Sequence, residues 1–496
     1  MIRRIFLKKP NVIIIYADDL GYGDLSCYGA EDINTPNIDN LLENGIKFTN
    51  AYSTSAVCTP ARYSIITGEY PFRNEYTKIL PGNAKCIIDT DVYTLPKMFK
   101  TAGYNTAVIG KWHLGLSDGD INWNGQITKT PNDLGFDYSF IFPGTNDRVP
   151  LVYIKNRQIY NLDPNDPIEV CYQMKCPFEN EIDTYENSPE KIVMESSMGH
   201  NRSLINGIGR IGFMRGGKSA IWKDDELSET FLGEVKNFID EKRDKPFFIY
   251  YALHQPHVPR VPSARFKGAT ALGPRGDVIV ELDWCIGELT SYLRENNLLD
   301  DTIIIFSSDN GPVLNDGYDD KAYELNKNHR PAGPLRGGKY SKFDGGARVP
   351  FILSWSNNIS KAESPALLSQ VDLMNSFANM LDISLDKYDA KDSQNMIDVL
   401  LGKTIVGRPS LVFESGKKIR ILRRGKWAYL QPSEGEEIIP IVLNETGNSL
   451  NDQLYNMDYD ISQRINVADQ YPQIVESMKQ ELEQILQSTH TRKKSI

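Results

Sequence analysis

The hydrophobic residues of this chain form four short continuous runs, which predict strands buried on both faces of a sheet. The runs span 11–17, 105–110, 246–253 and 302–308. Each run ends in charged, imidazole or amide side chains that are followed by turn residues. Because ligands of open α/β sheets bind beyond the carboxyl ends of parallel strands, these four endings predict one shared site.

Between the strands, apolar residues recur at the three- and four-residue spacing of amphipathic helices. One predicted helix begins near Thr35-Pro36 and stops at Gly45, and a second carries Leu95, Met98 and Phe99 and closes at Gly103. A third is predicted from a stripe of four residues, Leu282, Ile286, Leu289 and Leu293. Such alternation of strands and helices predicts right-handed crossovers and a layered α/β domain.

The pattern changes near 400–408, where glycine and proline interrupt it. Beyond this point the chain predicts short strands with turns between them and a final helix that contains Ile474, Met478, Leu482 and Ile485. We therefore expect a main α/β domain over residues 1–405. A smaller α+β subdomain, an antiparallel sheet with one helix, is expected over residues 406–496 and packs on the main domain.

The pentapeptide Cys58-Thr59-Pro60-Ala61-Arg62 lies where another helix is predicted to begin. Proline is well placed near a helix start, because its missing N–H costs no hydrogen bond there. Cys58 is therefore expected at the positive end of a helix dipole, beside the guanidinium of Arg62, where a nucleophile or an anion is stabilised. From these five residues alone, a small core cysteine next to an unrelated arginine is an equal alternative.

Two pairs of oxygen donors, Asp18-Asp19 and Asp309-Asn310, follow two of the predicted strands. Together they suit a hard cation, calcium or magnesium. No spacing typical of a zinc site is present, because Cys171 and Cys176 have no second pair nearby. Without Asp309-Asn310, a helix cap or a surface turn would be the better explanation of Asp18-Asp19.

A set of cationic side chains completes the expected site. Such a set binds an oxyanion, and histidine is the natural proton carrier near neutral pH. Its members are Arg62, Lys111, His113, His257 and Lys339. Lys339 lies in a glycine-rich basic loop that is equally consistent with a solvated turn. The residues describe a metal-dependent site for a tetrahedral oxyanion ester, and composition does not separate sulfate from phosphate.

These motifs resemble the sulfatase family of the alkaline phosphatase superfamily. Residues 58–62 fit the signature Cys-x-Pro-x-Arg, and Gly110-Lys111-Trp112-His113-Leu114-Gly115 fits the second signature. Further matches follow in the family's order at 18–24, 256–257, 309–311 and 345–350. The resemblance runs from about Asn11 to the C-terminus. It implies a sulfuric ester hydrolase with an alkaline-phosphatase-like α/β fold, in which helices sandwich a large mixed, mostly parallel sheet.

The resemblance also implies roles for the site residues. A formylglycine-generating enzyme converts Cys58 to formylglycine (3-oxoalanine), and the hydrated aldehyde then attacks sulfur as a covalent nucleophile. Arg62 and Lys111 stabilise its negative charge. His257 and Lys339 hold the sulfate and protonate the departing alcohol.

In the second half of the implied reaction, His113 takes a proton from the other hydroxyl, which expels sulfate and restores the aldehyde. The implied cofactor is Ca²⁺, with Mg²⁺ as an alternative. Its implied ligands are Asp18, Asp19, Asp309, Asn310 and the modified side chain of Cys58.

Substrate specificity is expected to come from loops. The most suggestive is the basic, glycine-rich segment 196–219, for which an ordinary surface loop is an equal alternative. A second tier of substrate contacts comprises Thr145, which lies near where related arylsulfatases place a serine, together with His200, Arg202, His254 and His329. The resemblance favours a sulfated galactose or N-acetylgalactosamine unit of a glycosaminoglycan, mucin or algal glycan, with small aryl sulfates as surrogates.

Composition and charge limit the binding partners and the cellular locations that the sequence allows. The net charge of −10 and the lack of a basic stripe argue against nucleic acid as a partner. No run approaches eighteen apolar residues, so no membrane helix is expected. Residues 1–10 have a basic patch but too short an apolar stretch for a signal peptide. Family members are frequently exported, so a periplasmic or extracellular location and a cytoplasmic one both stay open.

Three alternatives to a sulfatase remain at this stage. A phosphodiesterase or phosphonate monoester hydrolase would use the same formylglycine. A non-catalytic protein would keep Cys58 as a thiol and merely hold an anion. A two-zinc phosphatase is disfavoured, because the sequence lacks the extra His and Asp ligands after the last strand.

Overall fold

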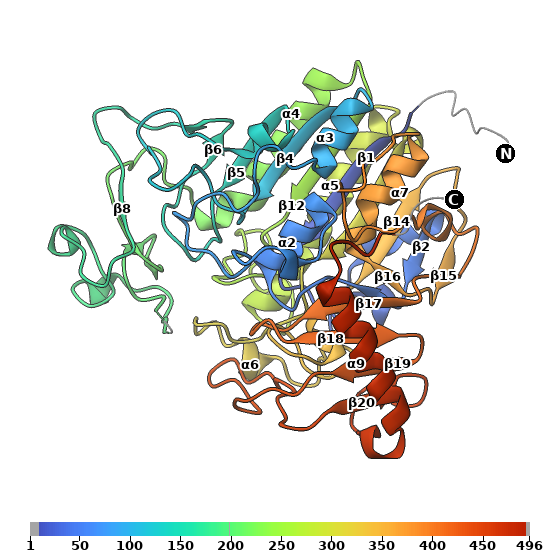
Figure 1. Ribbon diagram of the computed structural model, residues 1–496. Coiled ribbons are helices and arrows are strands. Elements are labelled where there is room, and N and C mark those ends of the chain that lie inside the picture. Colours follow the sequence, from blue (N-terminus) through green and yellow to red (C-terminus); the bar gives the residue numbers. More distant parts are fainter. Residues whose placement is uncertain (1–8, 198, 493–496) are drawn as a thin grey trace.

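A ten-stranded mixed sheet forms the centre of the computed structural model, which describes residues 9–197 and 199–492 (Figure 1). The features predicted for residues 1–8 lie outside this range. The strand order is β15-β2-β14-β13-β1-β12-β4-β5-β6-β7. In chain order the strands are β1 (Asn11–Ala17), β2 (Gly45–Phe48), β4 (Asn105–Lys111), β5 (Tyr138–Phe142), β6 (Ile154–Lys155), β7 (Gln158–Ile159), β12 (Phe247–Ala252), β13 (Thr302–Ser308), β14 (Phe351–Trp355) and β15 (Ala362–Ser364).

The four predicted strands are confirmed as neighbours at the middle of this sheet. β13, β1, β12 and β4 lie side by side and are all parallel. Nearly every residue in them is buried, because helices cover both faces. This explains their continuous apolar sequences. Parallel alignment also brings their carboxyl ends to the same edge of the sheet.

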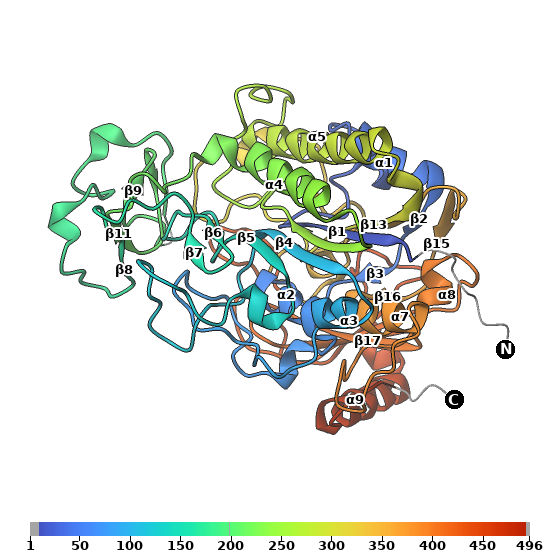
Figure 2. The same cartoon turned by 90° about the horizontal axis from the view of Figure 1, so that it is seen from above.

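Helices cover both faces of the sheet, as expected for the predicted fold class (Figure 2). On one face lie α1 (Pro36–Asn40), α4 (Leu227–Lys242) and α5 (Pro274–Glu295); on the other lie α2 (Cys58–Thr67), α3 (Leu95–Thr101) and α7 (Leu373–Met380). The predicted stripe from Leu282 to Leu293 is fully buried on α5. The helix predicted before Gly45 is split into α1 and a 3₁₀ turn (Leu41–Asn44). Gly45 is extended and begins β2 instead of forming a left-handed cap.

The C-terminal part forms a four-stranded antiparallel sheet, as predicted, in the order β17-β18-β19-β20. Met478 and Leu482 of α9 (Pro472–Gln487) are buried against this sheet (Figure 1). Its other face packs on the main sheet's loops through a cluster that includes Tyr52 and Phe413. The strands are β17 (Ser410–Glu414), β18 (Arg420–Arg424), β19 (Trp427–Leu430) and β20 (Gln453–Asn456). The fold class is thereby confirmed, while the domain boundary at 405 stays a prediction.

The remaining elements are short. Two two-stranded pairs join segments that are distant in the sequence, a third is a local hairpin, and one group of these elements projects from the molecule around β8 (Figure 1). The pairs are β3 (Ala51–Tyr52) with β16 (Leu368–Ser369), β8 (Glu169–Cys171) with β11 (Phe213–Arg215), and β9 (Leu204–Ile205) with β10 (Ile208–Gly209); the short helices are α6 (Ala322–Leu325) and α8 (Ile397–Leu400). In the described part of the chain, no helix combines the length and apolar character needed to cross a membrane.

Glu414 at the end of β17 predicts a measurable pH dependence of stability. Neither of its buried carboxylate oxygens accepts a hydrogen bond from a described residue, although Arg420 Nε lies 3.2 Å away. Burial raises the pKa of Glu414 from 4.5 to about 7, although Arg420 and Lys418 oppose that rise. The folded state therefore holds this proton more tightly than the unfolded state, and stability falls as pH rises from 4.5 to 7.

At pH 8 we expect Glu414→Gln to be more stable than the wild type. The free energy of unfolding of the variant minus that of the wild type should be about 3 kcal/mol larger at pH 8 than at pH 4.5. The neutral amide mimics the protonated acid at every pH. Urea unfolding of both proteins at the two pH values measures this difference. An equal difference at pH 4.5 and pH 8 would contradict the assignment.

Candidate active site

The polar ends of the four parallel strands converge, as the sequence indicates. Asp18 and Asp19 follow β1, Asp309 follows β13, Lys111 ends β4, and His257 lies beyond β12. Lys111 Nζ donates to Asp18 Oδ2 at 2.5 Å, and the backbone N–H of Asp19 donates to Asp309 Oδ1 at 3.2 Å. All five side chains are buried. The edge of the sheet therefore holds a dense, alternating set of carboxylates and cations.

Cys58 is the first residue of α2, so its side chain lies at the positive end of the helix dipole. It is only 2% exposed, and its Sγ lies 3.3 Å from His113 Nδ1. Burial raises the pKa of the Cys58 thiol, although Lys111 and Lys339 oppose that rise. A thiol with a raised pKa is a poor nucleophile. The pocket is thus poorly suited to a reactive thiolate at position 58.

His113 faces Cys58 in a defined protonation state. Its Nε2 lies 2.9 Å from the carbonyl oxygen of Leu80, which can only accept a hydrogen bond, so Nε2 carries the proton. Burial, together with Lys111 and Arg148, holds the pKa of His113 well below its usual value. The imidazole is therefore neutral, and its unprotonated Nδ1 points at residue 58, as a general base there requires.

Arg62 lies one helical turn after Cys58 and is fully buried. Its Nε and one terminal nitrogen donate to Asp309 Oδ2 at 3.0 and 2.8 Å, and the same terminal nitrogen lies 3.7 Å from Asp18 Oδ1. Burial and the Asp309 charge raise the pKa of Asp18 well above its usual value, although Lys111 and Arg62 oppose that rise. The cations at this end of the site therefore compensate only part of the cost of burying the two carboxylates.

Lys339 is 2% exposed, which excludes a solvated turn at this position. Its Nζ donates to Asp19 Oδ2 and to Asp316 Oδ2, both at 2.8 Å. Burial alone lowers the pKa of Lys339, but Asp19 and Asp316 raise it well above the usual value. Lys339 is thus protonated at neutral pH and has a proton to give. Asp316 was not predicted as part of the site, because it lies in a loop without hydrophobic periodicity.

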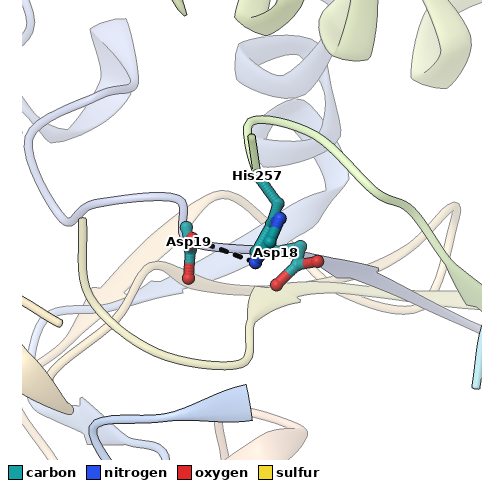
Figure 3. A group of neighbouring side chains, drawn as sticks. All are labelled: Asp18, Asp19 and His257. Atoms are coloured by element: carbon teal, nitrogen blue, oxygen red, sulfur yellow. Dashed lines mark ion pairs between the residues drawn. The ribbon is translucent and has the colours of Figure 1, made fainter. Parts of the chain in front are cut away.

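The site contains buried oxygens that no described residue satisfies. Asp18 Oδ1 and Asn310 Oδ1 have no hydrogen-bond partner. Such atoms are costly unless a cation or water lies against them. Ligand atoms of Asp18, Asp19 and His257 lie within 4.8 Å of one another, and their side chains face a common space (Figure 3). This oxygen-rich set suits a hard divalent cation.

His257 therefore joins the group of candidate metal ligands, which differs from its predicted role. Its Nδ1 lies 2.6 Å from the carbonyl oxygen of Val258 and donates to it, so the free lone pair is on Nε2, which lies 3.9 Å from Asp19 Oδ2. Burial, Lys339 and Lys111 keep the pKa of His257 well below its usual value. Asp309, in contrast, already receives hydrogen bonds on both oxygens.

Backbone strain also marks the site. Asp19 and His113 have φ values of 63° and 56°, a region in which non-glycine residues cost roughly 1–3 kcal/mol. Two glycines of the quoted motifs allow close backbone contacts. A Cβ at Gly110 would lie 1.9 Å from Ala252 O, and one at Gly311 would lie 1.7 Å from Gly345 O. Glycine is therefore required at positions 110 and 311, where the backbone of a neighbouring segment leaves no room for a side chain.

Two second-tier residues, Thr145 and His200, meet on one carboxylate. His200 Nε2 lies 3.0 Å from Asp147 Oδ2, and Thr145 donates to Asp147 Oδ1. Arg148 donates to both oxygens of Asp147, at 2.7 and 2.9 Å. Burial raises the pKa of Asp147, but Arg148 and His200 outweigh it and hold this pKa well below its usual value.

The Asp147–Arg148 pair was not predicted from the sequence. Both residues lie just beyond β5, a fifth parallel strand of the sheet. The apolar run 138–142 followed by a polar turn is the same signal that identified the other four endings. Arg148 also helps to lower the pKa of His113, the side chain that faces residue 58.

The other second-tier residues lie differently. His329 Nε2 is 2.9 Å from Asp24 Oδ1, which also binds Arg275. Arg202 lies over the ring of Phe213, 5.7 Å from its centroid. Neither forms a hydrogen bond or ion pair with the described residues of the site, so both are better explained as parts of the fold.

His254 is buried near the ring of Phe231, and its Nδ1 has no described partner. Burial lowers the pKa of His254 to about 3. In the segment 196–219, Arg210 pairs with Asp224, and Arg215 pairs with Glu169 and Glu181. These pairs neutralise much of the expected basic surface.

Comparisons with known proteins place this geometry in a family. The family profile described as Sulfatase matches residues 10–383. An N-acetylgalactosamine-6-O-sulfatase of Bacteroides thetaiotaomicron is 46% identical over 486 residues, which covers 98% of this chain and 94% of the relative. Human arylsulfatase A is 26% identical and covers 95% of this chain and 87% of its own length.

Solved structures agree. A structure from work on the metabolism of multiple glycosaminoglycans by Bacteroides thetaiotaomicron superposes with a TM-score of 0.95 at 46% identity, covering 97% of this chain and 100% of that chain. The phosphonate monoester hydrolase of Agrobacterium radiobacter shares the fold at 16% identity, with a TM-score of 0.59. The resemblance seen in the sequence is confirmed: the chain belongs to the sulfatase family and is a sulfuric ester hydrolase.

Proposed function

We propose that this enzyme removes the 6-O-sulfate of N-acetylgalactosamine units in a sulfated glycan. The observation that supports this substrate is the 46% identity, over 98% of the chain, to an enzyme named for that reaction. Sulfated galactose is the nearest alternative, because it differs at the 2-substituent alone. Small aryl sulfates are expected to serve as surrogate substrates.

We further propose that a formylglycine-generating enzyme oxidises Cys58 to formylglycine, which reacts as the hydrate. One hydroxyl of the hydrate attacks sulfur, and the S–O bond to the sugar breaks. Lys339 is the favoured proton donor to the departing alcohol, because Asp19 and Asp316 keep it protonated. Neutral His257 is less suited to that role.

The second step releases sulfate. His113 Nδ1 faces residue 58 and is unprotonated, so it accepts the proton of the remaining hydroxyl. The bond between carbon and the sulfated oxygen then breaks, sulfate leaves, and the aldehyde re-forms. Arg62 and Lys111 supply fixed positive charge beside this reaction, which stabilises negative charge on the nucleophile oxygen.

The proposed cation is Ca²⁺, with Mg²⁺ as an alternative. Asp18, Asp19, Asn310 and His257 face its position, and Asp309 borders it. When bound, the cation supplies positive charge to the sulfate and to the nucleophile. We expect dialysis against a chelator to abolish sulfate release and added Ca²⁺ or Mg²⁺ to restore it, and a thermal-shift titration reports binding without turnover. Full activity after complete removal of divalent ions would refute the metal site.

Asp147 is proposed to orient the residues that contact the sugar. We expect Asp147→Asn to raise KM roughly tenfold, because the neutral amide holds Arg148 and His200 less firmly. The reaction of a small aryl sulfate should change less, since it has no sugar hydroxyls to recognise. Steady-state kinetics on both substrates, with a sulfated monosaccharide as the glycan, tests this. An equal loss on both substrates would assign Asp147 to the chemistry or to the fold.

Two measurements test the proposed function as a whole. A mass spectrum of the tryptic peptide that contains residue 58, from protein made in its native host, reports the aldehyde directly. Sulfate release from 6-sulfated and 4-sulfated N-acetylgalactosamine and 6-sulfated galactose, beside a phosphodiester and a phosphonate monoester, ranks the substrates. Preference for the phosphorus esters would favour the alternative hydrolase reaction, while an unmodified thiol with no turnover would favour a non-catalytic anion-binding protein.

A further inference from the structure

A cavity of about 270 Å³ lies next to the active site, where the C-terminal sheet meets the segment 436–448. Its volume is below the roughly 300–1,000 Å³ of pockets for drug-sized ligands, so it suits a single sugar ring. Its walls are mostly carbon, and two charged side chains lie at its edge. The residues that matter here are Tyr340, Lys417, Glu436, Ile439, Pro440 and Val442.

Tyr340 connects this cavity to the catalytic residues. Its hydroxyl donates to Asp316, the same carboxylate that holds Lys339. Its backbone N–H donates to Ala56 O at 2.8 Å, two residues before Cys58. The side-chain amide of Asn444 donates to Lys339 O at 3.1 Å. A group in the cavity would therefore lie beside the leaving-group end of the site.

The rim of the cavity is held in a strained conformation. Ile441 and Leu443 have φ values of 69° and 63°, which is exceptional for a β-branched residue such as Ile441 and for a bulky one such as Leu443. Their side chains are 44% and 47% exposed. Two backbone hydrogen bonds, Leu443 N to Ile439 O and Ile439 N to Asn444 O, fix the turn. Strain of this kind concentrates at binding and catalytic sites.

The charges of the cavity favour an uncharged ligand. Lys417 and Glu436 are exposed residues that line the cavity and form no ion pair within the described part of the chain, so one cation and one carboxylate are free to bind. A sugar ring offers hydroxyls that donate to Glu436 and accept from Lys417, and its C–H face packs on Tyr340. A uronate or a second sulfate would be attracted by Lys417 but repelled by Glu436, so the cavity offers an anionic ring no net electrostatic gain.

We propose that this cavity is a subsite for an uncharged sugar ring linked to the unit that loses its sulfate. The substrate chain then passes from the strand ends, over Tyr340, onto the C-terminal sheet. This inference rests on the proposed function and extends it, because it assigns the adjoining sugar to a neutral hexose or N-acetylhexosamine.

The test compares three substrates. They are N-acetylgalactosamine 6-sulfate alone, the same unit linked to N-acetylglucosamine, and the same unit linked to glucuronate. We expect the disaccharide with N-acetylglucosamine to have roughly tenfold higher kcat/KM than the monosaccharide. Lys417→Gln and Glu436→Gln should each lower the ratio of the disaccharide's kcat/KM to the monosaccharide's kcat/KM roughly three- to fivefold. Lys426→Gln is the matched control, because Lys426 is an exposed lysine of the same sheet that does not line the cavity.

A binding measurement separates this inference from the proposed function. Saturation-transfer NMR with the unsulfated neutral disaccharide should show contact in the wild type and in Lys426→Gln, and loss in the double variant of Lys417 and Glu436, whether or not sulfate is released. Three outcomes would each overturn the subsite. They are equal kcat/KM for the monosaccharide and its N-acetylglucosamine disaccharide, a preference for the glucuronate disaccharide, and unchanged NMR contact in the double variant. Failure to hydrolyse any of the three substrates, with this contact retained, would refute the proposed substrate alone.

Discussion

Cys58→Ala is expected to lower kcat for sulfate release by about 10⁴-fold or more, because the methyl group of alanine has no sulfur to be oxidised away and cannot become the proposed aldehyde. Binding should survive, since Arg62, Lys111, Lys339 and the carboxylates do not depend on the sulfur. The substitution deletes one buried atom, so the free energy of unfolding should fall by only about 1 kcal/mol. Sulfate release by ion chromatography and urea unfolding measure the two effects.

Cys285→Ala is the matched control. Cys285 is a buried cysteine of α5 that packs near Tyr251, on a covered face of the sheet. Its loss should cost similar stability and leave kcat within about twofold, because no reacting group touches it. Retained turnover in Cys58→Ala would mean that residue 58 is not the nucleophile. Loss in both variants would indicate a shared folding defect.

Arg62→Met is expected to have the second largest effect. It should lower both the free energy of unfolding and kcat. Removing one partner of a buried ion pair typically costs about 3–5 kcal/mol, because the carboxylate that remains is uncompensated. Here that carboxylate is Asp309, which receives two hydrogen bonds from Arg62. Loss of a fixed charge beside the reacting oxygen should also lower kcat by about 10²–10³-fold.

Arg408→Met separates the two properties. Arg408 forms a buried pair with Asp372 at 2.7 Å, outside the catalytic cluster. It should lose comparable stability, while kcat per folded molecule stays near the wild-type value. Unfolding curves give the folded fraction, and kinetics at low temperature give kcat. If Arg62→Met kept wild-type kcat once corrected for folding, its role would be structural alone.

Much of the fold was predictable, because strands covered on both faces need no polar positions. β1 and β13 agree with their predicted bounds, β4 extends one residue further, and β12 is one residue shorter at each end. The helix that begins at Cys58 was predictable from proline placement. The strand β5 was missed, and with it the pair Asp147 and Arg148, although the same signal was present at 138–142.

The sequence by itself determined the sheet's central strands, the family and the residues whose chemistry is written in short motifs. Only the tertiary structure decided how these groups are paired. Lys339 binds Asp316 and also Asp19, from which it is separated by 320 positions in the sequence. His257 lies close to the carboxylates of Asp18 and Asp19. His329 pairs with Asp24, and Arg210 pairs with Asp224, so neither side chain is directed to the site by its sequence motif alone. The physical reason is that an ion pair depends on where the backbone carries two side chains, and hydrophobic periodicity contains no record of that path.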